Sequence, residues 1–276
     1  MSEQQVLHNN EQIAIDWVNQ NQNELIELST KIWDFAELGL HEFKSSKLIA
    51  DYLEKEGFYI EMGVAGMPTA FVATWGSGKS PVIGLLGEYD ALPDLSQELA
   101  PTKMPIVEGG NGHGCGHNIY GVAAAGGAIA AKKVMEAQGI EGTVKFYGCP
   151  AEETLVGKTF MAREGVFDAS DICLTWHPMS TNTIWESSSL AMNSVKFTFF
   201  GQSAHAAANP EAGKSALKAV QLMDIGTQFL REHIIDEARI HSTITNGGGG
   251  PNVVPNKAQI WYYIRAPFRQ DVEDIY

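Results

Sequence analysis

The chain has 276 residues, of which 44% are hydrophobic and 19% charged, so it can fill an apolar core and is not a disordered polypeptide. With 33 Asp and Glu against 19 Lys and Arg, its formal net charge of -14 disfavours binding to nucleic acids. The longest small and apolar run, residues 121–131, falls short of the roughly 20 residues that a membrane span needs, so no membrane partner is expected. The N-terminus shows no signal peptide and the sequence has only 3 cysteines, so we expect a soluble cytoplasmic protein.

Two helices are predicted at the start of the chain. Between Ile13 and Phe35, apolar residues recur at three-to-four spacing, and Gly39 is a plausible stop signal. A second amphipathic stretch runs from Phe43 to Lys55 and ends before Gly57.

Short β-rich segments follow at residues 58–62, 70–75 and 82–86. The connector before the third contains the sequence Gly-Ser-Gly-Lys-Ser, which is similar to part of a phosphate-binding loop. That motif needs a glycine five residues before Gly78, where Ala73 stands, and a helix after it. We therefore expect a hairpin turn here.

Helices and strands then alternate, which indicates an α/β protein whose sheet is mostly parallel and covered by helices on both faces. The expected elements are a glycine-rich loop at 108–118, helices at 119–138 and 157–164, and strands at 144–148 and 172–176. After these elements, Trp185 is expected to pack as an ordinary apolar residue.

The pattern changes near residue 190 to strand, helix, strand and strand, which is most of a split βαβ, ferredoxin-like unit. Residues 271–276 read as the start of its next helix. We therefore predict two domains, a catalytic domain at 1–189 and a lid or dimerisation domain at 190–276, both incomplete because the chain is a fragment of a longer one. The expected segments of the second domain are 191–200, 213–232, 239–246 and 259–265.

Potential metal ligands follow the strands of the first domain. In an extended loop, Cys115 and His117 would point to the same side. Glu152 and Glu153 follow one strand and His177 follows the next. Because ligand sites in open α/β sheets lie at the carboxyl ends of the strands, these side chains are expected to converge.

Thiolate, imidazole and carboxylate together suit a transition metal, and two adjacent glutamates can supply one ligand and one free base. Taken singly, each residue has a simpler interpretation. Cys115 would be a small buried residue, His177 a hydrogen-bonded structural histidine, and the Glu-Glu pair a solvated turn. The shared position at strand ends favours a metal site.

The sequence contains six motifs in order along the chain: GEYDALP (87–93), NGHGCGHN (111–118), PAEE (150–153), WHP (176–178), GQSAHAAANP (201–210) and NVVPNKA (252–258). Together they resemble the dinuclear metallo-amidohydrolases, a group that includes aminoacylases and carboxypeptidase G. The residues of these motifs are most similar to those of the aminobenzoyl-glutamate hydrolase branch, whose members are substantially longer. The resemblance implies a zinc-exopeptidase-like catalytic domain with a ferredoxin-like lid.

The resemblance also implies roles for individual residues. Glu152 matches the general base, and His205 matches the lid histidine that reaches the active site of the other copy in a dimer and stabilises the oxyanion. Asn252 and Arg265 match lid residues that hold the substrate carboxylate and the reacting group. The matches to the family's metal ligands are Cys115, His117, Glu153 and His177.

One departure concerns the segment Glu88-Tyr89-Asp90, where many relatives carry a His-x-Asp ligand motif. We place Glu88 and Asp90 around the ligands rather than on the metal. His113 matches no ligand position and is expected to support the site or the fold.

The function implied is metal-dependent hydrolysis of an amide next to a free carboxylate, in small N-acyl or aminobenzoyl amino acids. The cofactors would be two divalent ions, zinc or manganese, with cobalt also suitable. The partners would be a second copy bound through the lid or a different subunit. The alternatives are an inactive fragment that only associates through its lid, and a metal-dependent dipeptidase.

Overall fold

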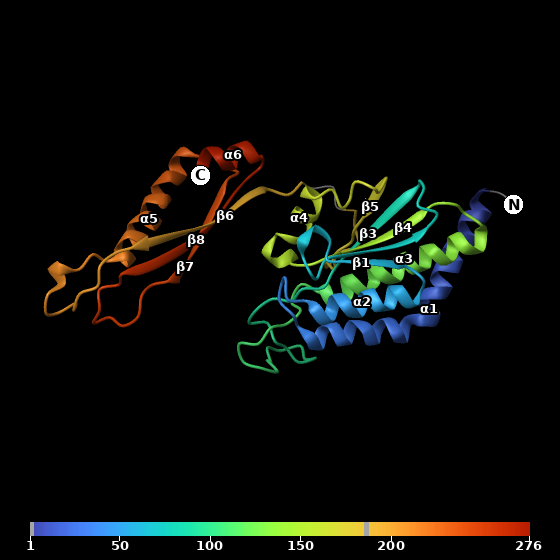
Figure 1. Cartoon of the computed structure of the whole chain (residues 1–276), viewed down its shortest axis with the longest axis horizontal. Helices are drawn as coiled ribbons and strands as arrows, with labels where there is room; N and C mark the ends of the chain where they lie inside the picture. The colour runs from blue at the N-terminus through green and yellow to red at the C-terminus, as the bar shows by residue number, and fades with distance from the viewer. Residues whose placement is uncertain (1–2, 185–187) are drawn as a thin grey trace. The chain divides into compact units, whose positions relative to one another are not determined.

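A computed structural model describes residues 3–184 and 188–276, so Trp185 lies outside the described residues (Figure 1). The chain divides into two compact units, residues 1–182 and 183–276, each with its own apolar core. Among the described residues, no helix has both the length and the hydropathy that a bilayer crossing requires.

The first unit combines one five-stranded sheet with several helices, and its elements follow the predicted order. The strand bounds are β1 (Tyr59–Met62), β2 (Phe71–Gly76), β3 (Val82–Glu88), β4 (Thr143–Cys149) and β5 (Ile172–Leu174). The helix bounds are α1 (Glu3–Phe35), α2 (Phe43–Lys55), α3 (His117–Gln138) and α4 (Gly157–Arg163), with short 3-10 turns η1 (Val64–Gly66) and η2 (Glu152–Thr154).

The strands of this sheet lie in the order β1-β2-β4-β3-β5. β3 pairs in parallel with β4 and β5, whereas β2 pairs antiparallel with β1 and β4. Only β2 therefore runs against the others, and the prediction of an α/β fold with a mostly parallel sheet is confirmed. β5 forms one edge, and its three residues are exposed.

The hairpin predicted between β2 and β3 is wrong, because β4 lies between these two strands. The connector after Gly76 carries the chain past β4 rather than reversing it onto a neighbour. Glycine-rich composition identifies a turn but not the strand that pairs next to it. The central position goes to β4 because most of its residues are buried, as a strand covered on both faces requires.

Helices α2 and α3 pack on one face of the sheet and α1 packs on these two helices, and apolar residues of all three join Phe71 and Phe146 in the main core. Met161 of α4 packs with Val72 and Tyr147 on the other face. A Cβ atom at Gly121 of α3 would lie 2.4 Å from the backbone oxygen of Glu88, so glycine is needed for α3 to approach β3 this closely.

The second unit is a three-stranded antiparallel sheet in the order β6-β8-β7. Alternate residues of β8 are buried, and they form the core with α5 and α6. This strand order matches three strands of a ferredoxin-like unit. The bounds are β6 (Ala191–Phe200), α5 (Ala216–Leu230), β7 (Arg239–Asn246), β8 (Lys257–Ala266) and α6 (Arg269–Ile275), with short 3-10 turns at Pro210–Ala212 and Arg231–His233.

Candidate metal centre

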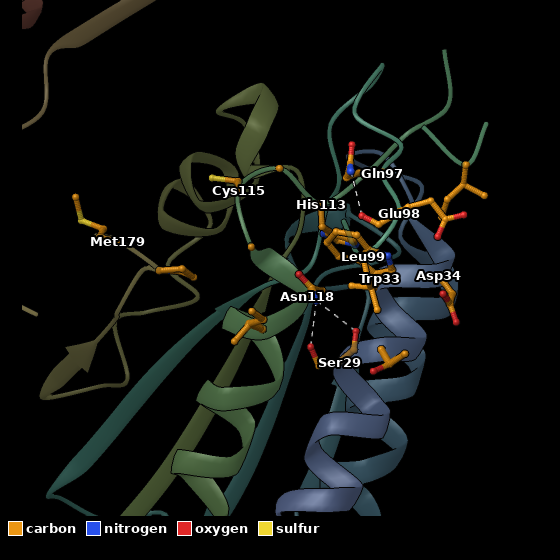
Figure 2. A pocket seen from close by; sticks show the side chains of 16 residues that line it. Ser29, Trp33, Asp34, Gln97, Glu98, Leu99, His113, Cys115, Asn118 and Met179 are labelled. Atoms are coloured by element: carbon orange, nitrogen blue, oxygen red, sulfur yellow. Dashed lines mark hydrogen bonds between the residues drawn. The ribbon is translucent and has the colours of Figure 1, made fainter. Parts of the chain in front are cut away.

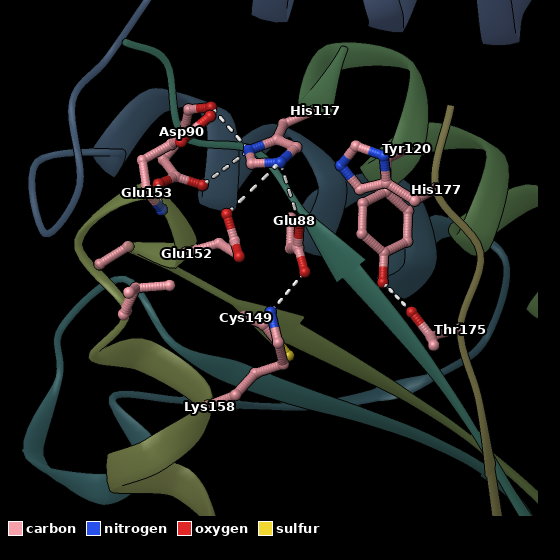
Figure 3. A network of polar contacts seen from close by, with 12 residues as sticks. Glu88, Asp90, His117, Tyr120, Cys149, Glu152, Glu153, Lys158, Thr175 and His177 are labelled. Carbon is pink, nitrogen blue, oxygen red and sulfur yellow. Dashed lines mark hydrogen bonds and ion pairs between the residues drawn. The ribbon is translucent and has the colours of Figure 1, made fainter. Parts of the chain in front are cut away.

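The polar cluster of the first unit lies where β3 and β4 end and α3 begins (Figure 3). Cys115 and His117 do not share an extended loop as expected. Gly116, with a φ of 81°, reverses the backbone, and His117 becomes the first residue of α3. Glycine tolerates this left-handed conformation. The turn still brings the Cys115 sulfur and a His117 ring nitrogen into one group with His177, whose ligand atoms all lie within 4.8 Å of one another.

His117 is completely buried, and carboxylates surround its ring. Its Nδ1 lies 3.0 Å from both Oδ1 and the backbone oxygen of Asp90. Its Nε2 lies 3.0 Å from Oε2 of Glu88 and 3.9 Å from Oε2 of Glu152. Asp90 therefore orients the ring and leaves Nε2 directed at the other two carboxylates, as Figure 3 shows.

These carboxylates control the protonation of His117. Burial alone would lower the pKa of His117, but the hydrogen bond with Asp90 and the contact with Glu88 raise it to about 10. Burial likewise opposes ionisation of Glu88, yet its contacts with His117 and Lys158 lower its pKa overall. Lys158 of α4 donates a hydrogen bond to Oε1 of Glu88, which leaves Oε2 directed at His117.

Glu152 and Glu153 stand on the short turn η2. Left-handed residues bracket the turn, Ala151 with a φ of 55° and Leu155 with a φ of 59°. The backbone N–H of Glu153 donates to Oδ2 of Asp90 at 2.9 Å. Asp90 therefore holds both the His117 ring and the glutamate turn.

Cys115 and His177 complete the cluster, with 3.3 Å between the Cys115 sulfur and Nε2 of His177. Burial, reinforced by the negative charge of Glu153, raises the pKa of the Cys115 thiol to about 12. Burial also raises the pKa of Glu153. A divalent cation would reverse this excess of negative charge and favour the deprotonated ligands.

Three buried atoms of the cluster lack a hydrogen-bond partner within the described part of the chain: Oε2 of Glu88, Nε2 of His117 and Oε1 of Glu153. Oε2 of Glu88 and Nε2 of His117 are close enough to form an ion pair, but they are not aligned for a hydrogen bond. Buried polar atoms rarely stay unpaired, and a shared cation satisfies such atoms without hydrogen-bond geometry. The residues present therefore fit a metal centre. Glu88, which was expected outside the ligand set, forms a second candidate group with His117 and Glu152.

His113 does not join these groups. Its Nε2 lies 3.0 Å from the backbone oxygen of Ile32 in α1, and its ring stacks on Trp33 with 6.3 Å between ring centroids. Burial lowers the pKa of His113 to about 4, so the ring is neutral and its Nε2 donates to that oxygen.

The remaining candidate residues lie in the second unit. Nδ1 of His205 accepts the backbone N–H groups of Ala207 and Ala208, so the other ring nitrogen of neutral His205 carries the proton. The backbone oxygen of Asn252 accepts the N–H of Ala206, which places the His205 and Asn252 loops side by side. Asn252 lies shortly before the start of β8, whereas Arg265 lies near the end of this strand, eight residues after Lys257.

Two residues of this site were missed from the sequence. Lys158 lies on the short helix α4, where a lysine usually indicates a solvated face. Glu42 lies more than a hundred positions before the turn that it contacts, and its Oε1 accepts the N–H of Ala151 at 2.7 Å. No local pattern in the sequence signals either contact.

A pocket of about 700 Å³ lies beside the polar cluster, with Cys115 in its wall (Figure 2). Figure 2 shows Cys115 and Met179 on one side and Trp33 and Leu99 on the other. Other apolar lining residues are Ile106, Ile119 and Pro178, and polar ones include Asp34, Gln97, Glu98 and Asn118.

A family model described as peptidase family M20/M25/M40 matches residues 84–270. The chain is 49% identical over 265 residues to one subunit of the p-aminobenzoyl-glutamate hydrolase of Escherichia coli, covering 95% of this chain and 54% of that protein. It is 30% identical to Xaa-Arg dipeptidase of Mus musculus, covering 94% of this chain and 59% of that protein. The chain thus spans a little over half the length of these relatives.

Among solved structures, the fold is similar to that of a dinuclear metal binding peptidase from the M20 family of Bacillus subtilis. The TM-score is 0.60 and the identity 20%, with 93% of this chain and 67% of that chain covered.

Proposed function

Because the chain belongs to the peptidase family M20/M25/M40, we propose that its activity is the metal-dependent hydrolysis of an amide next to a free carboxylate. The preferred substrates would be N-acyl or aminobenzoyl amino acids. The 49% identity to a p-aminobenzoyl-glutamate hydrolase subunit supports this substrate class. Free dipeptides are the second candidate, because a 30% identical relative is an Xaa-Arg dipeptidase.

The observation that carries the proposal is the convergence of unpaired ligand atoms around His117. Cys115, His117, Glu153 and His177 would hold two divalent ions, either zinc or manganese, with cobalt also suitable. The unpaired oxygen of Glu88 makes it a further candidate ligand. When bound, the ions would lower the pKa of water and polarise the substrate carbonyl.

Glu152 is proposed as the general base. It lies on the same turn as Glu153, and its carboxylate is partly exposed, with 30% of its side-chain surface accessible. It can therefore accept a proton from the attacking water and return it to the departing amine. Asp90 would keep Nδ1 of His117 protonated and its Nε2 directed at the metal, as in other carboxylate–histidine–metal arrangements.

The lid residues would act on the substrate. Since Nδ1 of His205 accepts two backbone N–H groups, its Nε2–H is the free donor for a developing oxyanion. Arg265 offers a planar fork for a carboxylate. His205 and Asn252 are separated from Arg265 by most of β8, on the order of 25 Å of extended strand. This separation supports a homodimer in which two chains serve one substrate.

The pocket beside Cys115 is proposed to hold the acyl group. Its aromatic and aliphatic walls suit an apolar or aromatic substituent, as ligand pockets of this size usually do. The three cysteines are free in the described part of the chain, which supports a reducing, cytoplasmic location. A different polypeptide is the alternative partner, since the Escherichia coli relative is one subunit of its hydrolase.

The test is hydrolysis by the metal-loaded chain of aminobenzoyl-glutamate, N-acyl amino acids and free dipeptides. Glu152→Gln should lower kcat about 10²- to 10⁴-fold while metal stoichiometry stays unchanged. Glu153→Gln should instead lower metal affinity. Glu152→Gln with unchanged kcat would refute the assignment of the base. Preference for free dipeptides would favour the second candidate, and metal binding without any hydrolysis would support an inactive chain that only associates.

A further inference from the structure

Glu42, directly before α2, is a completely buried acidic residue outside the polar cluster. Its Oε1 accepts the backbone N–H of Ala151 at 2.7 Å, and its Oε2 accepts the hydroxyl of Thr69 at 3.0 Å. Both carboxylate oxygens are therefore engaged, and one of them bonds the residue directly before Glu152.

Ala151 needs such support because its backbone is left-handed, with a φ of 55° and a ψ of 41°. This conformation is unfavourable for a residue with a Cβ atom and persists only where the surroundings impose it. A Cβ atom at Gly39 would lie 3.0 Å from Cα of Ala151, so the loop between α1 and α2 also packs directly against this residue.

The turn is thus held at two backbone N–H groups by two carboxylates. Asp90 binds Glu153 and is itself part of the polar cluster. Glu42 binds Ala151 and has no direct contact with His117 or with the pair of glutamates among the interactions described. It is fixed instead through Thr69, whose backbone oxygen accepts the hydroxyl of Tyr89 at 2.5 Å.

We infer that Glu42 is a positioning residue, which holds the backbone of η2 through Ala151 so that Glu152 and Glu153 face His117. The inference rests on the proposed function for the roles of these two glutamates. It goes beyond that function by assigning the orientation of the base and of one ligand to a side chain that touches neither metal nor substrate.

The test compares variants that remove or weaken the hydrogen bond to Ala151 with variants that keep it. Glu42→Met keeps an unbranched side chain without acceptors, whereas Glu42→Gln can accept from Ala151 and donate to Thr69. Thr69→Val is the matched control, because it removes a hydrogen bond from the same carboxylate and leaves the bond to Ala151. Glu42→Asp withdraws the carboxylate by one methylene and replaces the methionine variant if that variant does not fold.

The first measurement is amide hydrogen exchange of the metal-free chain at Glu153, whose own acceptor Asp90 is unchanged in every variant. Glu42→Met should accelerate exchange at Glu153 at least tenfold, and Glu42→Gln and Thr69→Val should stay within about twofold of the original chain. Unchanged exchange at Glu153 in Glu42→Met, or equal acceleration in Thr69→Val, would overturn the inference.

The second measurement is the affinity for Zn²⁺ by calorimetric titration. Loss of support for a ligand typically costs 10- to 100-fold, so Glu42→Met should weaken binding about tenfold, and Glu42→Gln should restore it. An unchanged affinity in Glu42→Met would overturn the inference. If the original chain binds no metal, the proposed function fails, while the exchange rates at Glu153 still decide the role of Glu42.

Discussion

At the scale of single residues, the centre depends on Asp90 making two different hydrogen bonds. One oxygen accepts Nδ1–H of His117 and the other accepts the backbone N–H of Glu153. Only a carboxylate offers an acceptor on both sides, because an asparagine would turn its NH₂ group toward one of these donors. Asp90 thereby couples the orientation of the histidine to that of the glutamate turn.

We predict that Asp90→Asn lowers the affinity for Zn²⁺ by about 10- to 100-fold, the usual effect of losing the partner of a metal-ligating histidine. Calorimetric titration measures this change. Asp51→Asn, an exposed substitution on α2, is the control and should leave the affinity unaltered. An affinity within twofold of the original in Asp90→Asn would show that Asp90 does not orient the ligands.

Glu42 should also make stability depend on pH. Burial, with a smaller contribution from nearby Asp90, raises its pKa above the ordinary 4.5 despite its hydrogen bonds to Ala151 and Thr69. The folded state then binds the proton more tightly than the unfolded state. The stability that Glu42 contributes by binding this proton is therefore fully present below about pH 4.5. It is lost as the pH rises through the raised pKa of Glu42.

Glu42→Gln stays uncharged, so its free energy of unfolding relative to the original chain should increase between pH 4.5 and 7. Urea denaturation at several pH values measures this difference. Glu54→Gln, on the exposed side of α2, is the control. A pH-independent difference for Glu42→Gln would contradict the expected protonation.

At the scale of helices and strands, close packing of α3 against β3 sets the distance between His117 and Glu88. Gly121 and Gly126 both lie on α3 but meet different surroundings. A Cβ atom at Gly121 would lie 2.4 Å from the backbone oxygen of Glu88, whereas one at Gly126 would make an ordinary contact of 3.4 Å with Leu25.

We therefore expect Gly121→Ala to lower the free energy of unfolding by about 1–3 kcal/mol, the usual cost of overpacking. Gly126→Ala should raise it by up to about 1 kcal/mol, since alanine favours the helix. Chemical denaturation of both variants tests the contrast. Equal effects of the two substitutions would mean that the approach of α3 to β3 is not limited by Gly121.

The sequence predicted the bounds of individual helices and strands, but it did not predict which strands lie next to one another in the sheet. Periodicity predicted α2 between Phe43 and Lys55 and β7 between Arg239 and Asn246 with the observed bounds, because the pattern reflects burial of one face. The order of strands depends on contacts between distant segments, so β4 between β2 and β3 was not foreseen.

The same limit applies to the centre. Potential ligand residues after successive strands indicated where the polar cluster would form, because parallel strands end at one edge of the sheet. The contacts of Glu42 with Ala151 and of Lys158 with Glu88 join segments that no motif connects. The left-handed turn at Gly116 was also missed, although glycine is the residue that such a turn favours.

At the scale of the whole molecule, the metal ligands proposed here all belong to the unit of residues 1–182. Metal should therefore stabilise the two units unequally. At a free concentration about 100 times the dissociation constant, binding adds about 2.7 kcal/mol to the folded state that binds.

Hydrogen exchange measured by mass spectrometry can resolve this effect along the chain. On removal of Zn²⁺ with a chelator, peptides from β3, β4 and α3 should exchange up to about 100-fold faster. Peptides from α5, β7 and β8 serve as the internal control and should be unaffected. Equal acceleration in both units would mean that the metal does not bind at the cluster around His117.

Strand β5 has a consequence for handling the chain in solution. Among the described strands it pairs with β3 alone, and Ile172 and Leu174 are more than half exposed. An apolar strand with one free row of backbone donors and acceptors recruits other extended polypeptides, which is how ordered aggregates begin. Ile172→Lys should therefore delay turbidity in concentrated samples, because charge on an outer strand opposes such stacking.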